Sequence, residues 1–261
     1  MNLDIPLSLS PQPSAKPATT SLPRDPFLVD LRRAHPDFAV HCIFDVGANI
    51  GQSVDRYRRA CPAAVIHAFE PVRQSHAVLL ERFGHDAGVH CRRLALGSTV
   101  KIGALMRASG TSTDNHLLEG TPRPGLPVES VEVSTGEAYC SAQGVDRIDF
   151  LKIDAEGHDM EVLKGFLGLL RGHRIGFVQV EASMNPGNRR HVPFAQFTAL
   201  LEPLGYYLFG LYDQVRELRE GRPALRRSNT VFVSQRLPPW SQPRRNPEAA
   251  LQRKGANRTA G

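Results

Sequence analysis

The sequence has few of the features that mark secreted, membrane-spanning or disulfide-stabilised proteins. It contains four cysteines in 261 residues, and no two are spaced as a metal-binding pair. It lacks the run of about 18 apolar residues that a membrane-spanning helix needs. Its first residues do not combine a basic region with an apolar one, as a secretory signal does. These absences predict a cytoplasmic protein with no membrane span and with reduced thiols.

Basic charge is in excess only near the C-terminus. The formal net charge is +6, but residues 222–261 contain nine Lys or Arg residues and one acid. The other 221 residues contain 23 basic and 25 acidic residues, a net of −2. The body of the protein is therefore close to neutral, which makes nucleic acid an unlikely partner for it.

Proline-rich segments flank a strongly patterned middle. Six prolines lie in residues 1–26 among Ser, Thr and Ala, and four more follow between residues 238 and 247. Such composition cannot assemble a core. We therefore predict a flexible arm at residues 1–26, a single folded domain at 27–236 and a flexible basic tail at 237–261.

Within the middle, short apolar runs alternate with stretches in which apolar residues recur every three or four positions. This alternation predicts βαβ crossovers and a doubly wound, mainly parallel sheet of the α/β class, covered on both faces. Pro71 is expected at the first position of a helix, with Gly84 at its end. Strands are predicted at 41–46, 64–69, 89–94, 148–153, 176–180, 206–211 and 230–233, and helices near 50–61, 71–83, 160–171 and 194–204.

The turn after the first strand reads Asp45-Val-Gly47-Ala48-Asn49-Ile-Gly51. Ligands of open α/β sheets bind beyond the carboxyl ends of the strands, and glycines there let a ligand lie against bare backbone. The turn is not a dinucleotide fingerprint, because the second and third glycines of that motif are missing. The sequence also has no phosphate loop of the G-x-x-x-x-G-K-[ST] type. A nucleotide bound through its phosphates is therefore not expected.

Glu70, followed by Pro71, ends the second strand 23 residues after Gly47. A carboxylate there can accept hydrogen bonds from both ribose hydroxyls of an adenosine ligand. Asp45 favours a cation over a phosphate. Together they predict a nucleoside with a positively charged end, which S-adenosylmethionine fits better than NAD or ATP. The predicted cofactor residues are Asp45, Gly47, Ala48, Asn49, Gly51, Glu70 and Pro71.

Acidic side chains follow the strand at 148–153. If that strand continues to Glu156, then Asp154 and Glu156 point to one face. They are the first candidates for a general base, with His158 as another, although a histidine at a helix start often only packs or faces solvent. Asp159 is expected to begin the next helix, where the helix dipole favours an acid.

Two further features leave alternatives open. Glu181 ends the next strand and is expected to form another wall of the cleft. A divalent metal bridging Asp154 and Glu181 is an open alternative, without an assigned ligand set. Residues 97–135 look irregular, and their composition suits a lid or acceptor wall as well as a surface excursion.

The motifs resemble the FkbM family of S-adenosylmethionine-dependent methyltransferases. The resemblance covers residues 43–233, and its most specific part is Lys152-Ile-Asp154-Ala-Glu156-Gly157. It implies a seven-strand, Rossmann-like class I methyltransferase fold whose last strand is antiparallel. It also implies methylation of hydroxyl groups, often on sugars or polyketide-type products. In this family the turn after the first strand and Glu70 would line the cofactor, and Asp154 and Glu156 would face the reaction centre.

Three functions remain as hypotheses. The first is O-methylation of a hydroxyl on a sugar, glycan or secondary metabolite. The second is an RNA-modifying methyltransferase with a basic arm, and the third is a non-catalytic module that holds a nucleoside. The acceptor and the oligomeric state stay open. The basic arm of the second hypothesis would comprise Arg226, Arg227, Arg236, Arg244, Arg245, Arg253 and Lys254.

Overall fold

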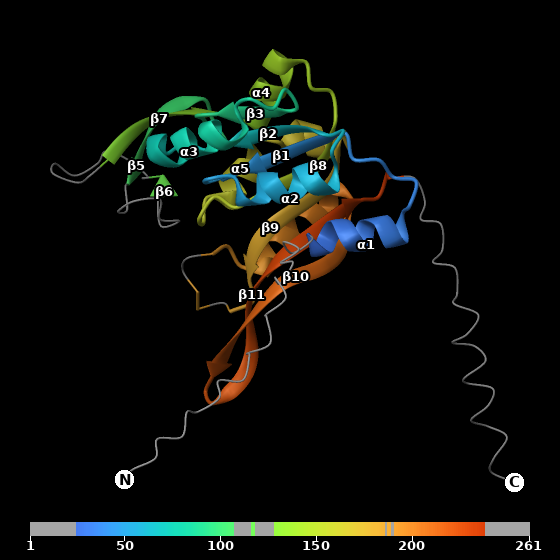
Figure 1. The fold of residues 1–261 in the computed structure, drawn as a ribbon. Coiled ribbons are helices and arrows are strands. Elements are labelled where there is room, and N and C mark those ends of the chain that lie inside the picture. The colour runs from blue at the N-terminus through green and yellow to red at the C-terminus, as the bar shows by residue number, and fades with distance from the viewer. Residues whose placement is uncertain (1–24, 107–115, 118–127, 186, 189–190, 238–261) are drawn as a thin grey trace, which may run out of the picture.

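A seven-stranded sheet forms the centre of the computed structural model, which describes residues 25–106, 116–117, 128–185, 187–188 and 191–237 (Figure 1). Its strand order is β10-β11-β9-β8-β1-β2-β3. Neighbouring strands from β9 to β3 are parallel, whereas β11 is antiparallel to both of its neighbours. The prediction of a doubly wound, mainly parallel sheet is confirmed. The strands are β1 (Cys42–Val46), β2 (Val65–Phe69), β3 (Val89–Arg92), β8 (Ile148–Ile153), β9 (Ile175–Ser183), β10 (Tyr206–Arg219) and β11 (Arg222–Ser234).

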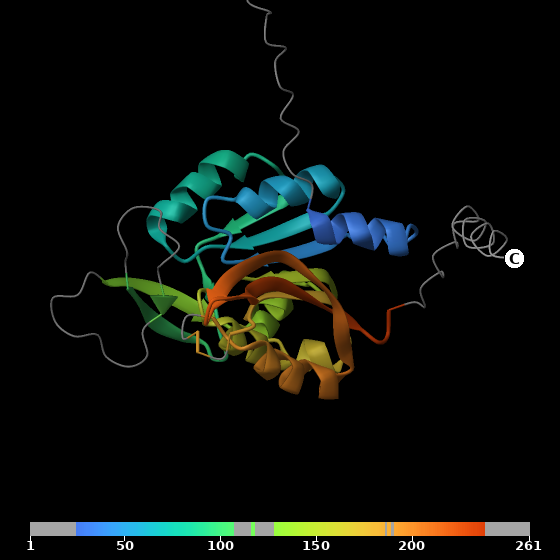
Figure 2. The same ribbon diagram turned by 90° about the horizontal axis from the view of Figure 1, so that it is seen from below.

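Helices cover both faces of this sheet (Figure 2). Because successive side chains of a strand point to opposite faces, Ile43 and Phe44 of β1 lie in two different hydrophobic clusters. Ile43 packs with the helices of one face, and Phe44 with those of the other. Helices on both faces bury β8 along its whole length, including the charged residues Asp149 and Lys152. One face carries α1 (Pro26–Ala34), α2 (Gln52–Ala60) and α3 (Arg73–Phe83), and the other α4 (Gly136–Gln143), α5 (Asp159–Lys164), α6 (Leu167–Arg171) and α7 (Phe194–Leu201).

Helix α1 was not expected from the sequence. Asp25 caps it by accepting a hydrogen bond from Leu28 N at 3.1 Å, and Pro26 occupies its first turn. Phe27 is fully buried, with ring centroids 4.8 Å from Phe150 and 5.2 Å from Phe177. Asp25 and Pro26 thus belong to the folded domain, because a proline that resembles the arm in composition also suits a helix start. The rest of the predicted arm, residues 1–24, lies outside the described residues.

The helix boundaries agree with the predicted proline and glycine positions, with two exceptions. Pro71 does not begin α3, because Val72 is the N-cap and Pro71 precedes it. The helix predicted near 160–171 is divided into α5 and α6 at Gly165. A Cβ on Gly165 would lie 2.1 Å from the carbonyl oxygen of Gly97, so this close approach requires glycine. As predicted, Gly84 ends α3, and Gly172 ends α6.

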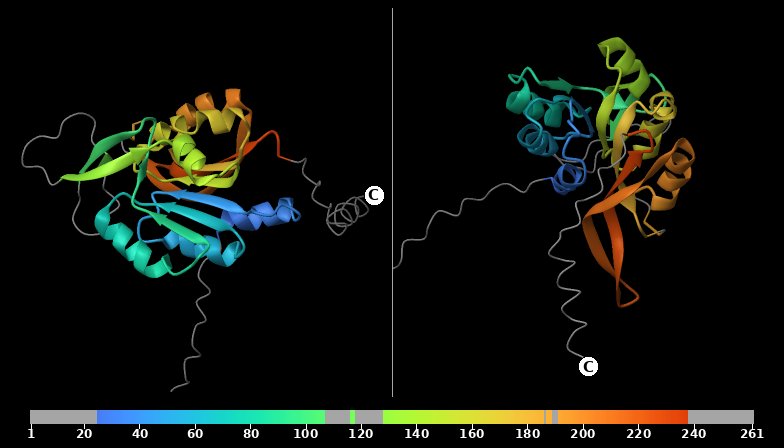
Figure 3. Two further views of the ribbon diagram at one scale, coloured as in Figure 1. Left: turned by 90° about the horizontal axis from the view of Figure 1, so that it is seen from above. Right: turned by 90° about the vertical axis from the view of Figure 1, so that its right-hand side faces the viewer.

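A second sheet follows β3. Its order is β4-β7-β5-β6, and it projects to one side of the main sheet (Figure 3). The strand predicted at 89–94 therefore ends at Arg92, where the chain leaves the main sheet. The segment 97–135, predicted to be irregular, contains three strands among its described residues, while 107–115 and 118–127 lie outside the described residues. The strands are β4 (Ala95–Leu96), β5 (Lys101–Met106), β6 (His116–Leu117) and β7 (Val128–Ser134).

Strands β10 and β11 form a hairpin that is longer than predicted. β11 pairs with β9 only from Arg227 to Val233, so residues 213–226 extend beyond the sheet as a two-stranded ribbon (Figure 3). The turn at Glu220 and Gly221 has φ angles of 51° and 75°, as a two-residue hairpin turn requires. Leu237, which was assigned to the tail, is 8% exposed and packs in the core, and residues 238–261 lie outside the described residues. No helix in the described part of the chain is long and apolar enough to cross a membrane.

Candidate cofactor and active site

A cavity of about 270 Å³ opens at the carboxyl ends of β1, β2 and β8. Its volume is close to the lower end of the range of about 300–1,000 Å³ for small-ligand pockets. Of the predicted cofactor residues, Gly47, Ala48, Asn49, Glu70 and Pro71 line it. The predicted catalytic residues Asp154, Glu156 and His158 line it as well. Three segments distant in sequence thus meet where the sequence placed them.

The loop after β1 is pressed against the end of β8. Gly47 has a φ of +79°, and a Cβ there would lie 2.0 Å from the carbonyl oxygen of Asp154. The amides of Gly47 and Ala48 donate to the carbonyl oxygen of Phe69 at 3.0 and 2.9 Å. Asn49 also has a positive φ, of 49°, and its buried Oδ1 has no hydrogen-bond partner among the described residues. The loop therefore presents an acceptor to the cavity that a ligand can satisfy.

We expect Gly47→Ala to destabilise the protein more than replacement of a glycine that has a positive φ but no close neighbour. Gly144 supplies the matched control, because its φ is +65° but nothing lies within 4 Å of its added Cβ. Gly144→Ala should cost about 1–2 kcal/mol in the free energy of unfolding, and Gly47→Ala should exceed it because the loop must also move. Equal losses in urea denaturation would contradict the close packing of the two loops.

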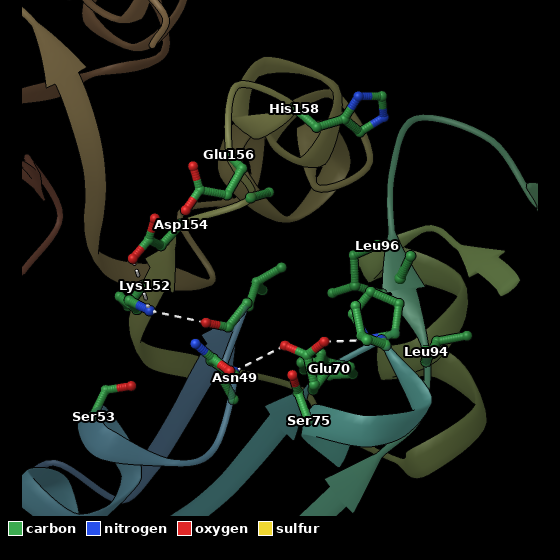
Figure 4. Close-up of a pocket in the computed structure, with 18 of the residues that line it drawn as sticks. Asn49, Ser53, Glu70, Ser75, Leu94, Leu96, Lys152, Asp154, Glu156 and His158 are labelled. Carbon is green, nitrogen blue, oxygen red and sulfur yellow. Dashed lines mark hydrogen bonds and ion pairs between the residues drawn. The ribbon is translucent and has the colours of Figure 1, made fainter. Parts of the chain in front are cut away.

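The Glu70 side chain links the loop after β1 to the segment after β2 through hydrogen bonds. Its Oε2 accepts from Asn49 N at 2.9 Å and its Oε1 from Val72 N at 2.8 Å. The residue is only 6% exposed, and burial raises the pKa of its carboxyl to about 7, although the two backbone hydrogen bonds lower it. Each oxygen keeps a second lone pair for a ligand that donates hydrogen bonds. Figure 4 shows this carboxylate beside the loop of Asn49.

Asp45 is fully buried and does not line the cavity. It accepts a hydrogen bond from Ser53 Oγ and lies 3.0 Å from Lys152 Nζ. The same ammonium group lies 3.5 Å from Asp154 Oδ2 and 3.4 Å from the carbonyl oxygen of Gly47. Burial lowers the pKa of Lys152, but the two carboxylates outweigh it and hold that pKa above its ordinary value. The sequence predicted that Asp45 would face the positive charge of a bound ligand. In the structure, the positive charge beside Asp45 is the Lys152 ammonium group.

The sequence alone does not indicate the role of Lys152. A lysine inside a buried strand signals a partner charge, but the partner can be named only when β1 and β8 are known to be adjacent.

Gly51, a predicted cofactor residue, does not line the cavity. A Cβ added to it would lie 2.4 Å from the ring of Phe83, so glycine is required there for packing against α3.

The loop after β8 carries the candidate catalytic residues (Figure 4). The strand ends at Ile153, so Asp154 and Glu156 do not share a face of an extended strand as expected. Glu156 instead has a φ of +50°, which is costly for a residue with a side chain and marks a constrained position. His158 is the N-cap of α5, and its ring is turned away from Asp154. Asp159 begins α5 as predicted.

Glu181 is not part of the cavity wall, which corrects the expectation from the sequence. β9 continues to Ser183, so Glu181 lies within the strand, where it forms ion pairs with Arg227 and with His191 Nε2, the latter at 2.8 Å. Gln179 lines the cavity instead. No group of three or more His, Cys, Asp or Glu side chains in the described part of the chain is placed to hold a metal ion. The structure therefore offers no support for a metal between Asp154 and Glu181.

The two ends of the cavity differ in chemistry. Leu94, Leu96 and Leu105 line one end, and they come from the second sheet and the segment that leads into it. Ser53 of α2 lies at the other end (Figure 4), and Gln52 and Arg56 of the same helix also line the cavity. The sequence alone does not place these residues at the site, because Leu105 reaches the cavity only through the second sheet and a helical period does not indicate which polar face meets a cavity.

The strand order, the antiparallel β11 and a cavity at the carboxyl ends of the strands define a class I methyltransferase fold of the Rossmann-like type. A family model described as "Methyltransferase FkbM domain" matches residues 45–208. The chain belongs to the FkbM methyltransferase family, as its motifs indicated.

One curated relative is "Methyltransferase sdnD" of Sordaria araneosa, which is 27% identical over 175 residues. The match covers 56% of this chain and 62% of that protein. Among solved structures, a precorrin-6y C5,15-methyltransferase of Geobacter metallireducens is 12% identical, with a TM-score of 0.41 and coverage of 79% of this chain and 86% of that one. TrmK of M. capricolum, solved with S-adenosylhomocysteine, is 10% identical, with a TM-score of 0.42 and coverage of 82% and 72%.

Proposed function

We propose that this protein is an S-adenosylmethionine-dependent methyltransferase that methylates a hydroxyl group of a small molecule or glycan. The observation that carries the proposal is the position of Glu70, whose buried carboxylate faces a cavity of nucleoside size at the switch point of the sheet. Membership of the FkbM methyltransferase family supports the reaction class.

The chemistry of the lining supports binding of the whole cofactor. Glu70 would accept hydrogen bonds from the ribose hydroxyls, and Asn49 Oδ1 would take a donor that no described residue supplies. The adenine would lie among Leu94, Leu96 and Leu105. S-adenosylmethionine would supply an activated methyl group on a positively charged sulfur. Asp45 would act indirectly, by holding Lys152 against the carbonyl oxygen of Gly47.

Glu156 is the proposed general base, in preference to Asp154. Asp154 lies 3.5 Å from the Lys152 ammonium, and this contact ties its carboxylate to the buried lysine. Glu156 lines the cavity on a backbone held at positive φ. The acceptor oxygen would take the methyl group, with the carbon–sulfur electron pair left on the sulfur, and the Glu156 carboxylate would take the hydroxyl proton. His158, which caps α5 at the end of the same loop, is a further candidate for the general base.

We expect Glu156→Gln to lower kcat by about 10²–10⁴-fold, the usual contribution of a general base. The amide keeps the size of the side chain but cannot accept the proton. Binding of S-adenosylhomocysteine, measured by calorimetry, should stay within about twofold. His158→Gln is the matched control on the same loop, and a loss of kcat there with full activity in Glu156→Gln would assign the base to His158 instead.

Methyl transfer itself is tested with radiolabelled S-adenosylmethionine and fractionated cell extract. Label in a metabolite or glycan fraction supports the proposal. Label in RNA that falls with added salt would favour the RNA-modifying alternative. For that alternative, Arg226 and Arg227 are unsuited to a free basic arm, since they lie in β11 and form ion pairs with Glu217 and Glu181. Cofactor binding with no labelled product in any fraction would favour a non-catalytic module.

A further inference from the structure

Arg56 is a cationic side chain of the cavity that the arrangement described so far does not use. It lies on α2 one turn after Gln52, and both residues line the cavity. Ser53 of the same helix lies across the cavity from Leu94 and Leu96 (Figure 4). Residues four apart on a helix share a face, so this face of α2 is directed to the cavity. Arg59 of the same helix is exposed, does not line the cavity and pairs with Asp55 at 2.9 Å.

The guanidinium of Arg56 forms no ion pair among the described residues. Its Nε is buried and has no hydrogen-bond partner there. The other Lys or Arg side chain of the lining, Lys152, is neutralised by Asp45 and Asp154. The charge of Arg56 lowers the pKa of both Lys152 and Asp25, but neither forms an ion pair with it. A buried donor of this kind is costly unless a ligand satisfies it.

We infer that Arg56 binds the α-carboxylate of the methionine part of S-adenosylmethionine, an inference that rests on the proposed function. With the ribose on Glu70 and the adenine at the apolar end, the methionine part must extend past Gly47 toward α2. The part of the ligand that reaches Arg56 then carries a carboxylate. A planar guanidinium can bind a carboxylate through two parallel hydrogen bonds, which a single ammonium group cannot do.

The test compares two ligands that differ only at this end. S-adenosylhomocysteine carries the amino-acid group, and 5′-methylthioadenosine has the same adenosine and sulfur without it. In calorimetry, Arg56→Met should raise the Kd of S-adenosylhomocysteine by about 10-fold to 100-fold, the range for hydrogen bonds to a charged group. The Kd of 5′-methylthioadenosine should change less than about twofold. This second ligand also reports that the variant is folded with an intact nucleoside site.

Two further variants sharpen the result. Arg56→Lys keeps the charge without the planar fork and should lose less affinity for S-adenosylhomocysteine than Arg56→Met. Arg59→Met, on the solvent face of the same helix, should leave both ligands unaffected. Equal weakening of both ligands by Arg56→Met would overturn the inference, since it would assign Arg56 a role in the shape of the cavity. No weakening of either would also overturn it, and wild-type protein that binds neither ligand would overturn the proposed function itself.

Discussion

Glu70→Ala is expected to weaken the binding of S-adenosylhomocysteine by about 100-fold or more. The change removes a carboxylate that can accept from two ribose hydroxyls, and each hydrogen bond to a charged group contributes about 1.5–3 kcal/mol. It also leaves the amides of Asn49 and Val72 without their acceptor. Isothermal titration calorimetry measures the loss directly. Unchanged affinity in Glu70→Ala would show that the ribose lies elsewhere.

The pH dependence of S-adenosylhomocysteine binding tests whether the negative charge of Glu70 is needed, and not only the size and shape of its side chain. Burial raises the pKa of this carboxyl to about 7, so a growing fraction is protonated as the pH falls below 7. A protonated carboxyl is a weaker acceptor for the ribose hydroxyls. Affinity should therefore rise with pH up to about 7 and level off above it. Glu70→Gln should bind weakly at every pH with a flatter profile, and a wild-type profile that is flat from pH 5 to 8 would contradict an ionised Glu70 as the ribose ligand.

Lys152→Met is expected to produce the largest loss of stability of any change in the site. It leaves Asp45 fully buried without its counter-charge, and breaking a buried ion pair in this way costs about 3–5 kcal/mol. For a domain of this size, that loss lowers Tm by about 10 °C or more. Differential scanning calorimetry or urea denaturation checks the value.

The double variant Asp45→Asn with Lys152→Met supplies the control. Asparagine can still accept the hydrogen bond from Ser53 but carries no charge, so the double variant should be more stable than Lys152→Met alone. If the double variant is as unstable as the sum of its single changes, the two residues are not energetically coupled, and the role assigned to the buried pair would be wrong.

The order of elements could be predicted because each one buries side chains with its own period. The strand 148–153 was predicted with its observed bounds, because a strand covered on both faces is buried throughout and lacks the strict polar alternation of a half-exposed strand. The second sheet and the ribbon at 213–226 were not predicted. Their strands have one exposed face, and in β7 buried and exposed residues simply alternate, a pattern that also occurs in polar loops.

The cofactor loop and Glu70 could be found from sequence because their chemistry is tied to the ends of adjacent parallel strands. The roles of Asp45 and Glu181 could not. Asp45 faces Lys152 rather than the cavity, and Glu181 faces Arg227 and His191. Whether a strand-end acid lines a cavity or pairs with a neighbour depends on which basic side chain the adjacent strand brings to it.

The sequence by itself determined the α/β class, the family and the three segments that meet at the cavity, because each is written in local periodicity or a contiguous motif. Only the tertiary structure decided which acids are already neutralised, where the strand at Asp154 stops and which face of α2 turns inward. Those properties depend on distances between strands and helices that are far apart along the chain, as the pairing of Lys152 with Asp45 shows, 107 residues apart in sequence and 3.0 Å apart in space.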